Sequence, residues 1–593
     1  MYLSELRLWN FRKYGKKGSS NTTDFLNKPH LTVPFKNGIN VLIGENDSGK
    51  TAIIDAIKLA LKTHAYEWIR VQETDFYKKE SKLRIELDFK GLTLSEASNF
   101  TEWLGLNGEK KSLLRVLYQV EINEGRILPS DVRAGMDDYG HNLNAEAREY
   151  LKVTYLKALR DADKDLTAKK NSRLSQILQE HKLFKIPKGE KHPFEDKFQN
   201  INDEIEEWFK IDNIEEENNK ASIKSQIKDK VDQFLQKFIR NETESSFTLG
   251  EPKIKNILEK ISLGVNNESN LGLGSMNRLY MAAELLHLKR EWNGLKLCLI
   301  EELEAHLHPQ AQMKIINALQ NETQEQFILT THSPNLASKV LLENMIMCKD
   351  KEVFPLGRQY TKLDKKDYKY LERFLDVTKS NLFFSKGVII VEGWSEEILI
   401  PAIAKQIGIN LTEKEVSIVN VASTAYLHFA NIFLRNDDKT LNIPVSIITD
   451  LDNKPNDDSE FDKEDTDKRK ESIEKAKEHI KNSCIELFVA KEWTLEWCLL
   501  KSSIIGDLFK EAVSLVHSKT IEFKKNNEEF DNNKFEKKLI EKLKKKTLYK
   551  TEISYKLAQL IIDKELDLSK SGDYIKYLKD AINHACNINE NKK

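Results

Sequence analysis

A chain of 593 residues is too long for one hydrophobic core, so about two to four domains are expected. Its 93 Lys and Arg residues nearly balance its 94 Asp and Glu residues, so a nucleic-acid partner would need a local basic patch. The five scattered cysteines include no CxxC pair, which argues against a zinc ribbon or a disulfide framework. No apolar run approaches the ~20 residues of a membrane span and the start is not signal-like, so we expect a soluble, cytoplasmic protein without a membrane partner.

The first predicted unit alternates apolar strands with a helix. Strands are predicted over LSELRLWNF, INVLIG and LRIELDF, and a helix over TAIIDAIKLAL between the last two. This alternation is typical of an α/β domain. We assign residues 1–160 to its N-terminal part and residues 256–375, where the strands LKLCLIEE and FILTTHS follow, to its C-terminal part.

The intervening residues 161–255 have a different composition. Lys, Glu, Asn and Gln dominate, glycine nearly vanishes, and apolar residues such as Ile177, Ile201, Phe209 and Phe234 recur at helical spacing. This periodicity predicts a helical insertion, which we expect to serve in dimerisation. The alternative is a disordered segment, because several stretches are very polar.

A second α/β unit is predicted over residues 376–593. The strand GVIIVEG is followed by a helix over SEEILIPAIAKQIG, a strand over VSIVNVA, a helix over YLHFANIFLRN and a strand over IPVSIITDLD. A run dense in Asp, Glu and Lys over 453–481 predicts a solvated loop and then a helix. The remaining residues predict Lys-rich helices.

A glycine loop between a strand and a helix matches the P-loop pattern G-x-x-x-x-G-K-[ST] in full. Its glycines let the backbone wrap a phosphate, and the N–H groups at the helix start face the negative charge. The lysine supplies a cation to the phosphates, and the threonine hydroxyl can bind Mg²⁺. The loop therefore predicts an ATP site whose residues are Gly44, Asn46, Gly49, Lys50 and Thr51.

Two later segments add groups for nucleotide hydrolysis. The strand LKLCLIEE ends in Glu301, placed to hold Mg²⁺, and Glu302, placed to polarise the attacking water. The strand FILTTHS ends at His332. These segments resemble the Walker B and switch-histidine segments of ABC-type ATPases, although relatives often have Asp where Glu301 stands. Gln72 is either the Q-loop glutamine of that family or an ordinary exposed side chain.

Two more segments extend this resemblance. LGLGSMNRLYMAAEL is similar to a degenerate signature loop, and Asn10-Phe11-Arg12 is similar to the N-terminal strand motif of the SMC-like and RecF-like branch. The resemblance implies that Ser275 contacts the γ-phosphate of ATP bound to another subunit. A homodimer or a higher homo-oligomer is therefore expected.

Carboxylates follow the predicted strands of the second unit. Glu392 ends one buried strand, Glu396 lies on the first turn of the next helix, and Asp450 and Asp452 follow another apolar strand. Carboxylates that share one crevice repel one another and are tolerable mainly when a divalent cation neutralises them. Oxygen-only ligands favour Mg²⁺ or Mn²⁺ over zinc. Glu397 is expected to be a surface group favoured by the helix dipole.

The pattern E-G-x-x-E followed by D-x-D is similar to the Toprim signature of topoisomerases, primases and a nuclease family. The order of ATPase, helical insertion and Toprim domain resembles the OLD (overcoming lysogenization defect) family of nucleases, which includes the Gabija nuclease subunit and retron-associated effectors. The implied fold class is α/β: an ABC-type P-loop ATPase head with a helical insertion, then a C-terminal Toprim (Rossmann-like) domain with added helices.

The resemblance implies further site residues near the C-terminus. Glu496 in the segment WTLE is the expected further metal ligand, with Glu492 as second choice. Lys550 in the segment KTEISYK is the expected catalytic cation, which would stabilise charge on the phosphate. The alternative for Lys550 is one more solvated lysine. The lysines crowded over 537–546 either grip phosphates or form a solvated face.

Together these features imply an ATP-regulated, Mg²⁺- or Mn²⁺-dependent DNA endonuclease or nickase of antiphage defence. The implied chemistry is two-metal phosphodiester hydrolysis, in which Glu392, Asp450 and Asp452 act with Lys550. Expected partners are DNA and the product of a neighbouring gene, such as a helicase or a reverse transcriptase. Two rival functions are a DNA-tethering or sensor ATPase whose Toprim domain only binds, and a primase-like polymerase.

Overall fold

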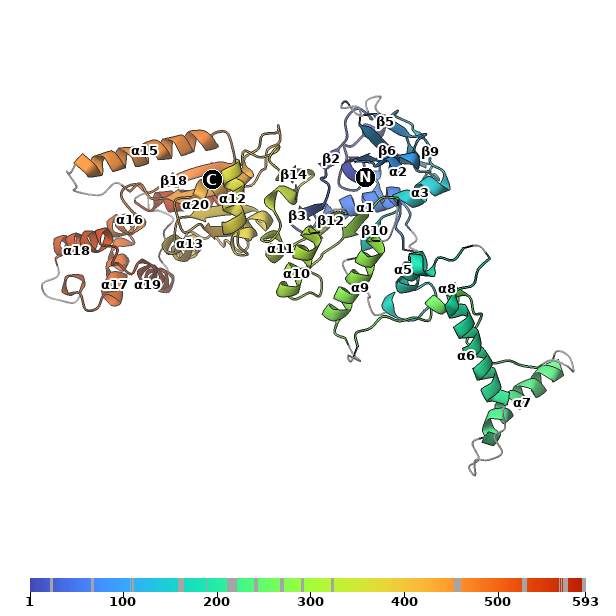
Figure 1. Ribbon diagram of the computed structural model, residues 1–593. Coiled ribbons are helices and arrows are strands. Elements are labelled where there is room, and N and C mark those ends of the chain that lie inside the picture. The colour runs from blue at the N-terminus through green and yellow to red at the C-terminus, as the bar shows by residue number, and fades with distance from the viewer. Residues whose placement is uncertain are drawn as a thin grey trace. The chain divides into compact units, whose positions relative to one another are not determined.

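The computed structural model describes residues 1–588 (Figure 1), except 22–24, 66–68, 107, 109–110, 158–164, 188, 211–220, 239–243, 267–270, 290–292, 322–324, 453–459, 525–530, 565, 567 and 569–573. The chain divides into two compact units. The first contains residues 1–38, 51–311 and 321–329, and the second contains residues 39–50, 312–320 and 330–593.

The N-terminal residues build an antiparallel sheet within the first unit. Its strand order is β2-β1-β4-β6-β8-β9, and β5 and β7 pair with β6. Leu6 of β1 lies opposite Leu87 of β4, and both side chains are buried. The strands are β1 (Tyr2–Trp9), β2 (Leu31–Pro34), β4 (Lys82–Lys90), β5 (Leu104–Leu106), β6 (Ser112–Asn123), β7 (Arg126–Ile127), β8 (Arg133–Ala134) and β9 (His141–Asn142).

A second sheet has the order β10-β11-β12-β3-β13-β14. Every residue of β11 and β3 is buried, as the apolar sequence LCLI and the largely apolar sequence INVLI predict for parallel strands covered on both faces. Its strands are β3 (Ile39–Ile43), β10 (Thr154–Leu156), β11 (Leu297–Ile300), β12 (Gln326–Thr331), β13 (Met345–Lys349) and β14 (Glu352–Pro355). The helices of this region include α1 (Lys50–Leu61), α2 (Leu94–Ser98), α3 (Ala145–Leu151), α9 (Leu273–Leu288), α10 (Pro309–Gln320), α11 (Pro334–Ala337) and α12 (Lys365–Phe374).

The described part of residues 161–255 is mainly helical. The helices are α5 (Arg173–Glu180), α6 (Pro193–Lys210), α7 (Ala221–Phe238) and α8 (Ile254–Leu258). Helices α6 and α7 pack against each other (Figure 1) and keep Trp208, Phe234 and Phe238 exposed. Exposed aromatic groups of this kind are typical of surfaces that associate with another chain.

A buried ion pair joins α5 to α9. Arg173 donates from Nε and Nη2 to the two carboxylate oxygens of Glu284 at 2.6 and 2.8 Å. Burial disfavours the charged guanidinium, but Glu284 outweighs burial and raises the pKa of Arg173. The pair therefore fixes the position of α5 along α9.

A four-stranded parallel sheet organises the rest of the second unit. Its order is β16-β15-β17-β18, and its strands are β15 (Gly387–Val391), β16 (Val416–Asn420), β17 (Val445–Thr449) and β18 (Ile485–Val489). Ile389, Leu399, Phe509 and Leu557 belong to its core. Its helices are α13 (Trp394–Gln406), α14 (Tyr426–Ala430), α15 (Glu460–Ile480), α16 (Leu495–Lys501), α17 (Gly506–Val516), α18 (Asn532–Lys544), α19 (Lys550–Asp563) and α20 (Lys576–Ala585).

The expected α/β class is confirmed, but the helix predicted over YLHFANIFLRN is shorter than its apolar pattern suggests. Helix α14 ends at Ala430, and a single 3-10 turn follows. The Asn431 side chain bonds Asp367 and His479, and Arg435 then forms a β-bridge with Thr361. Tertiary hydrogen bonds therefore end this helix. Among the described residues, no helix is both long enough and apolar enough to cross a membrane.

We expect Arg173→Met to destabilise the first unit by about 3–5 kcal/mol, because it leaves the Glu284 carboxylate buried without its cation. The change should appear as a lower midpoint of the first thermal transition. Glu206→Gln is the matched control, since it removes one partner of a solvent-exposed ion pair with Lys210. Equal midpoints for both variants would contradict this account.

Candidate nucleotide and metal sites

The P-loop is shaped by its glycines and by Lys50. Gly44 has a φ of 142°, and a Cβ there would lie 2.3 Å from the Cys348 carbonyl oxygen, so only glycine fits. The Lys50 ammonium donates to the carbonyl oxygens of Gly44 and Glu45 at 2.9 and 2.7 Å and to the Ser48 hydroxyl at 3.1 Å. The loop thus curls around the Lys50 ammonium at the start of α1. Asn46 and Thr51 are exposed beside it, and Gly49 has a φ of 104°.

The carboxylates after β11 differ in their surroundings. Glu301 is buried, and burial raises the pKa of its carboxyl group. It accepts a hydrogen bond from the Tyr155 hydroxyl at 2.6 Å, while the Lys58 ammonium lies 3.6 Å from the centre of the Tyr155 ring. Glu302 is exposed and has a φ of 43°. The sharp backbone turn at Glu302 therefore separates an enclosed carboxylate from a solvent-facing one.

The signature-like segment forms the first turn of α9. A Cβ on Gly274 would lie 2.9 Å from the His306 carbonyl oxygen, so this turn packs directly on the segment that follows β11. Ser275 is half-buried, and its hydroxyl accepts a hydrogen bond from Arg278 at 2.9 Å. Asn277 donates to the Ala305 carbonyl oxygen at 3.4 Å.

His332 follows β12 in the second unit and is half-buried. The next residue, Ser333, donates from its hydroxyl to the Gln312 side chain at 3.1 Å. This bond ties the segment that follows His332 to α10. Of the residues predicted to bind nucleotide, Gly44–Lys50 and His332 belong to the second unit, and Thr51, Ser275, Glu301 and Glu302 belong to the first.

An open pocket of about 590 Å³ in the first unit is lined by Gln72 and by Arg12 of the N-terminal motif. Arg12 donates to Asp55 at 2.8 Å and to Asp75 at 2.9 Å. Burial disfavours its charge, but these two carboxylates raise the pKa of Arg12. Gln72 is exposed and lines the same polar pocket as Arg12.

In the second unit, acids from neighbouring parallel strands meet at the carboxyl edge of the sheet. Glu392 follows β15 and Asp450 follows β17, which is the adjacent strand. Glu396 lies on the first turn of α13 and Glu496 on the first turn of α16, and both are buried. Four sequence-predicted carboxylates are thereby brought together.

The electrostatics show how closely these carboxylates interact. Burial, followed by the charges of Glu396, Glu496 and Glu392, raises the pKa of Asp450 well above its ordinary value. Burial and then Glu496 raise the pKa of Glu396 to about 7. Burial also raises the pKa of Glu392. Ionising all of these acids together is therefore unfavourable in the protein alone.

Lys550, at the start of α19, meets the cluster directly. Its ammonium donates to Glu496 at 2.9 Å. Burial opposes its charge, but Glu496, Asp450 and Glu396 raise the pKa of Lys550. Glu492, the second choice for a metal ligand, instead accepts hydrogen bonds from Trp497 at 2.7 Å and Tyr574 at 2.9 Å.

Asp452 lies slightly apart from the other acids. Its backbone N–H donates to the Trp493 carbonyl oxygen at 2.8 Å, and its φ of 59° is one that Asp tolerates. Its charge still reaches Glu392. Glu397, expected at the surface, instead accepts a hydrogen bond from Asn420 at 2.8 Å and is half-buried, because the end of β16 lies beside it.

Arg469 of α15 is a site residue that the sequence did not reveal. Its guanidinium donates to Glu392 at 3.2 Å and to the Thr449 hydroxyl at 2.6 Å, and lies 3.4 Å from Asp452. Thr449 in turn donates to Glu392. Arg469 stands in a run dense in Lys, Asp and Glu, where composition indicates only a solvated helix.

The lysines before Lys550 are partly engaged within their own helix. Lys538 and Lys545 both pair with Glu541, at 2.9 and 2.7 Å. Lys544 and Lys546 are exposed. The pairing favours a solvated face for this part of the segment.

The donor set fits Mg²⁺ or Mn²⁺. All acidic groups at this edge offer oxygen atoms, which these hard cations prefer. Burial and neighbouring carboxylates raise the pKa of Asp450 and of Glu396, so their charged forms are disfavoured, and a divalent cation would offset that cost. The residues that would hold such a cation are Glu392, Glu396, Asp450, Asp452 and Glu496.

At a pH above the raised pKa of Asp450, Asp450→Asn should raise the melting temperature of the protein in EDTA, because it removes one charge from the cluster at nearly constant volume. The gain should be about 2–4 °C for each kcal/mol of repulsion removed. The further rise on adding Mn²⁺ should shrink, since a ligand is lost. The control is Asp507→Asn, which removes the same charge from an exposed side chain of α17. An unchanged melting temperature in EDTA together with a full response to Mn²⁺ would contradict the assignment.

Comparisons with known proteins agree with this division of the chain. Residues 1–337 match the family described as AAA ATPase domain. Residues 383–452 match the family described as overcoming lysogenization defect protein-like, TOPRIM domain.

Individual relatives are distant. "Endonuclease GajA" of Bacillus cereus (strain HuB5-5) is 22% identical over 554 residues, which cover 78% of each chain. "Retron Vc95 probable ATPase" of Vibrio cholerae serotype O1 biovar El Tor is 24% identical over 400 residues, which cover 58% of this chain and 73% of the relative. The solved structure of the SmcHead bound to the C-winged helix domain of ScpA aligns with 60% of this chain and 97% of its own, at 17% identity and a TM-score of 0.34.

The expected order of an ATPase domain and a Toprim domain is confirmed, as is the resemblance to the OLD family. The ATPase match covers more than half of the chain, and the Toprim match contains Glu392, Glu396, Asp450 and Asp452. The chain belongs to the AAA ATPase domain family and carries an OLD-like Toprim domain, in distant relation to GajA and to the retron Vc95 ATPase.

Proposed function

We propose that this protein is an ATP-regulated, divalent-metal-dependent DNA endonuclease or nickase that acts in antiphage defence. The observation that carries the proposal is the meeting of Glu392, Glu396, Asp450 and Glu496 with Lys550 at one edge of the Toprim sheet. A module that only binds nucleic acid has no need of buried, mutually repelling acids. The relative named as an endonuclease supports the same activity.

The chain's own residues divide the work in this proposal. Bound Mg²⁺ or Mn²⁺ would supply an activated water and charge stabilisation at the leaving oxygen. Glu392 is oriented by Thr449 and Arg469, and Asp450 by its position directly after the rigid strand β17. The Lys550 ammonium lies at the cluster's edge, where it would stabilise charge that develops on a phosphate.

We propose that ATP acts as a conformational switch for this nuclease. A nucleotide held by the P-loop of one subunit and the signature turn of another would favour one dimer geometry over the alternatives. The proposed nucleotide contacts are Gly44, Asn46, Gly49, Lys50, Thr51, Ser275, Glu301, Glu302 and His332. The exposed aromatic residues of α6 and α7 support a dimerisation role for residues 161–255.

The remaining assignments follow the sequence boundaries. Residues 1–160 and 256–375 would form the ATPase head, and residues 376–593 the nuclease domain. DNA is the proposed substrate. A helicase or a reverse transcriptase with its retron DNA is the proposed operon partner, in keeping with a relative that belongs to a retron.

Supercoiled plasmid should be cut with Mg²⁺ or Mn²⁺ and spared in EDTA. Glu392→Ala, Asp450→Ala and Asp452→Ala should fold normally but cut slower by orders of magnitude, because each loses a metal oxygen. Lys550→Ala should still bind metal and cut about 10²-fold more slowly, because it loses only charge stabilisation. The measurements are cleavage rate, melting temperature and metal calorimetry.

The matched control for Lys550 is Lys556→Ala, an exposed lysine on the same helix. It should cut at the wild-type rate. If the four site variants remain folded and also cut at the wild-type rate, the nuclease proposal fails, and a DNA-tethering or sensor ATPase takes its place.

Glu302→Gln should bind ATP but hydrolyse it more slowly by about 2–4 kcal/mol in the barrier, since the amide cannot accept the proton of the attacking water. Trapped ATP should increase the dimer fraction in size-exclusion chromatography. Lys50→Ala, the comparison variant, should lose ATP binding itself. An unchanged ATPase rate in Glu302→Gln would mean that Glu301 or His332, and not Glu302, activates the attacking water.

A further inference from the structure

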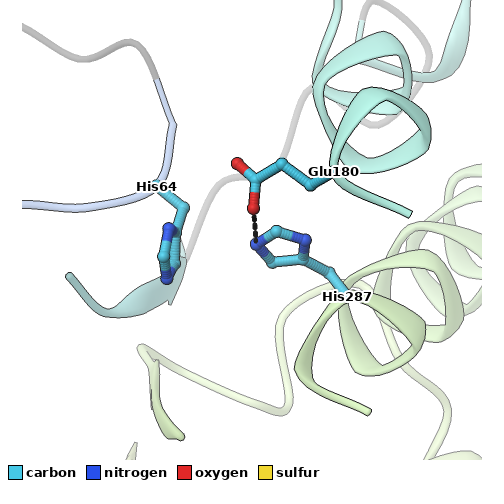
Figure 2. Close-up of side chains that lie close together, drawn as sticks. All are labelled: His64, Glu180 and His287. Atoms are coloured by element: carbon cyan, nitrogen blue, oxygen red, sulfur yellow. Dashed lines mark ion pairs between the residues drawn. The ribbon is translucent and has the colours of Figure 1, made fainter. Parts of the chain in front are cut away.

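Two histidines and a glutamate gather in the first unit, in a group that neither the nucleotide site nor the Toprim site uses (Figure 2). His64 follows the last turn of α1, Glu180 is the last residue of α5, and His287 lies in the last turn of α9. One ligand-type atom from each side chain lies within 4.8 Å of the other two. The group therefore joins the carboxyl ends of three helices.

The distances within this group suit shared coordination. The gap between His287 Nε2 and Glu180 Oε2 is 3.7 Å, which exceeds hydrogen-bond range. Two ligands of a tetrahedral Zn²⁺ with bonds of about 2.0–2.1 Å lie about 3.3 Å apart, so His287 and Glu180 need a shift of only a few tenths of an ångström. The remaining pairs, which lie within 4.8 Å, would close by side-chain rotation around the ion. The His64 and His287 rings are edge to face, with centroids 5.0 Å apart and an interplanar angle of 82°.

The surroundings hold these side chains in place. Figure 2 shows the Glu180 carboxylate and the His64 ring both beside the His287 ring. The His287 side chain is fully buried, while 37% of the Glu180 side chain is exposed. The Arg173–Glu284 ion pair joins α5 to α9 one helical turn before His287. The backbone N–H of His64 donates to the Val153 carbonyl oxygen at 3.0 Å. The group is thus supported on rigid elements and open to solvent on one side.

We propose that His64, Glu180 and His287 bind a divalent transition-metal ion, of which Zn²⁺ fits best. Two imidazoles and one carboxylate form a nitrogen–oxygen set that zinc and its neighbours prefer, unlike the all-oxygen set at the Toprim edge. Three protein ligands leave the fourth position to water on the solvent-facing side.

Such an ion would clamp helices whose opposite ends carry the proposed nucleotide contacts. Helix α1 begins at Lys50, and Gly274 and Ser275 form the first turn of α9. A helix transmits a constraint along its hydrogen-bonded length. The site therefore stabilises the helical framework of the ATPase unit rather than contributing to either reaction.

The test is calorimetric titration of the metal-stripped, full-length protein with Zn²⁺ in millimolar Mg²⁺. His64→Asn and Glu180→Gln are compared with the wild type, and His141→Asn, whose side chain is 78% exposed, is the matched control. We expect both site variants to bind one equivalent fewer of Zn²⁺ than the wild type, and His141→Asn to bind the same number. Any Zn²⁺ that binds to the Toprim acids contributes equally to the wild type and to each variant, so it does not change the difference in stoichiometry.

A second measurement uses Co²⁺ as an optical probe. The wild type and His141→Asn should show a visible absorption band of four-coordinate Co²⁺ that His64→Asn lacks. Circular dichroism checks that His64→Asn, which alters a half-buried side chain, remains folded. Equal Zn²⁺ stoichiometry in wild type and folded His64→Asn overturns the proposal, and so does an unchanged Co²⁺ band.

Discussion

Mutual repulsion among the acids at the carboxyl edge of the Toprim sheet is the constraint around which the second unit is organised. Burial and neighbouring charges both disfavour the ionised forms of Asp450 and Glu396. The cost of ionisation would fall if the acids could move away from one another. The core prevents that movement, because β15 and β17 are fully buried and α13 packs against α19. Apolar packing thus stabilises an arrangement that electrostatics opposes.

The fold also explains why acids from distant segments meet. Parallel strands end at one edge of a sheet, so Glu392 and Asp450 become neighbours although many residues separate them. Helices α13, α16 and α19 each begin near that edge, and their first turns present Glu396, Glu496 and Lys550. Helix starts favour carboxylates, which lowers the cost of placing acids there.

The sequence predicted those parts of the site that depend on local order. Strand ends and the P-loop are contiguous patterns, so Glu392, Asp450 and Lys50 could be placed on their elements without a fold. Glu496 and Lys550 came from family resemblance, because no spacing links them to β17. Arg469 was missed, since its partners are set by tertiary packing within a run whose composition indicates only solvent exposure.

Nonlocal packing limits prediction in the first unit as well. His64, Glu180 and His287 share no motif, and their meeting depends on the register at which α5 packs on α9. That register follows from the buried Arg173–Glu284 pair, whose members look like ordinary charged residues in an amphipathic sequence. The early end of α14 has the same origin, because hydrogen bonds to Asn431 override an apolar helical pattern.

The pairing of Lys550 with Glu496 connects the electrostatic constraint with the proposed chemistry. In the structure this ammonium is the cation that contacts the buried Glu496 carboxylate at 2.9 Å. A ligand role for Glu496 would replace that ion pair, and the long, flexible lysine side chain would then be available to a phosphate. In the proposed nuclease, Lys550 would therefore offset the cluster's charge before metal binds and act on substrate afterwards. An arginine, whose planar guanidinium prefers a fixed two-pronged contact, would be less suited to this exchange.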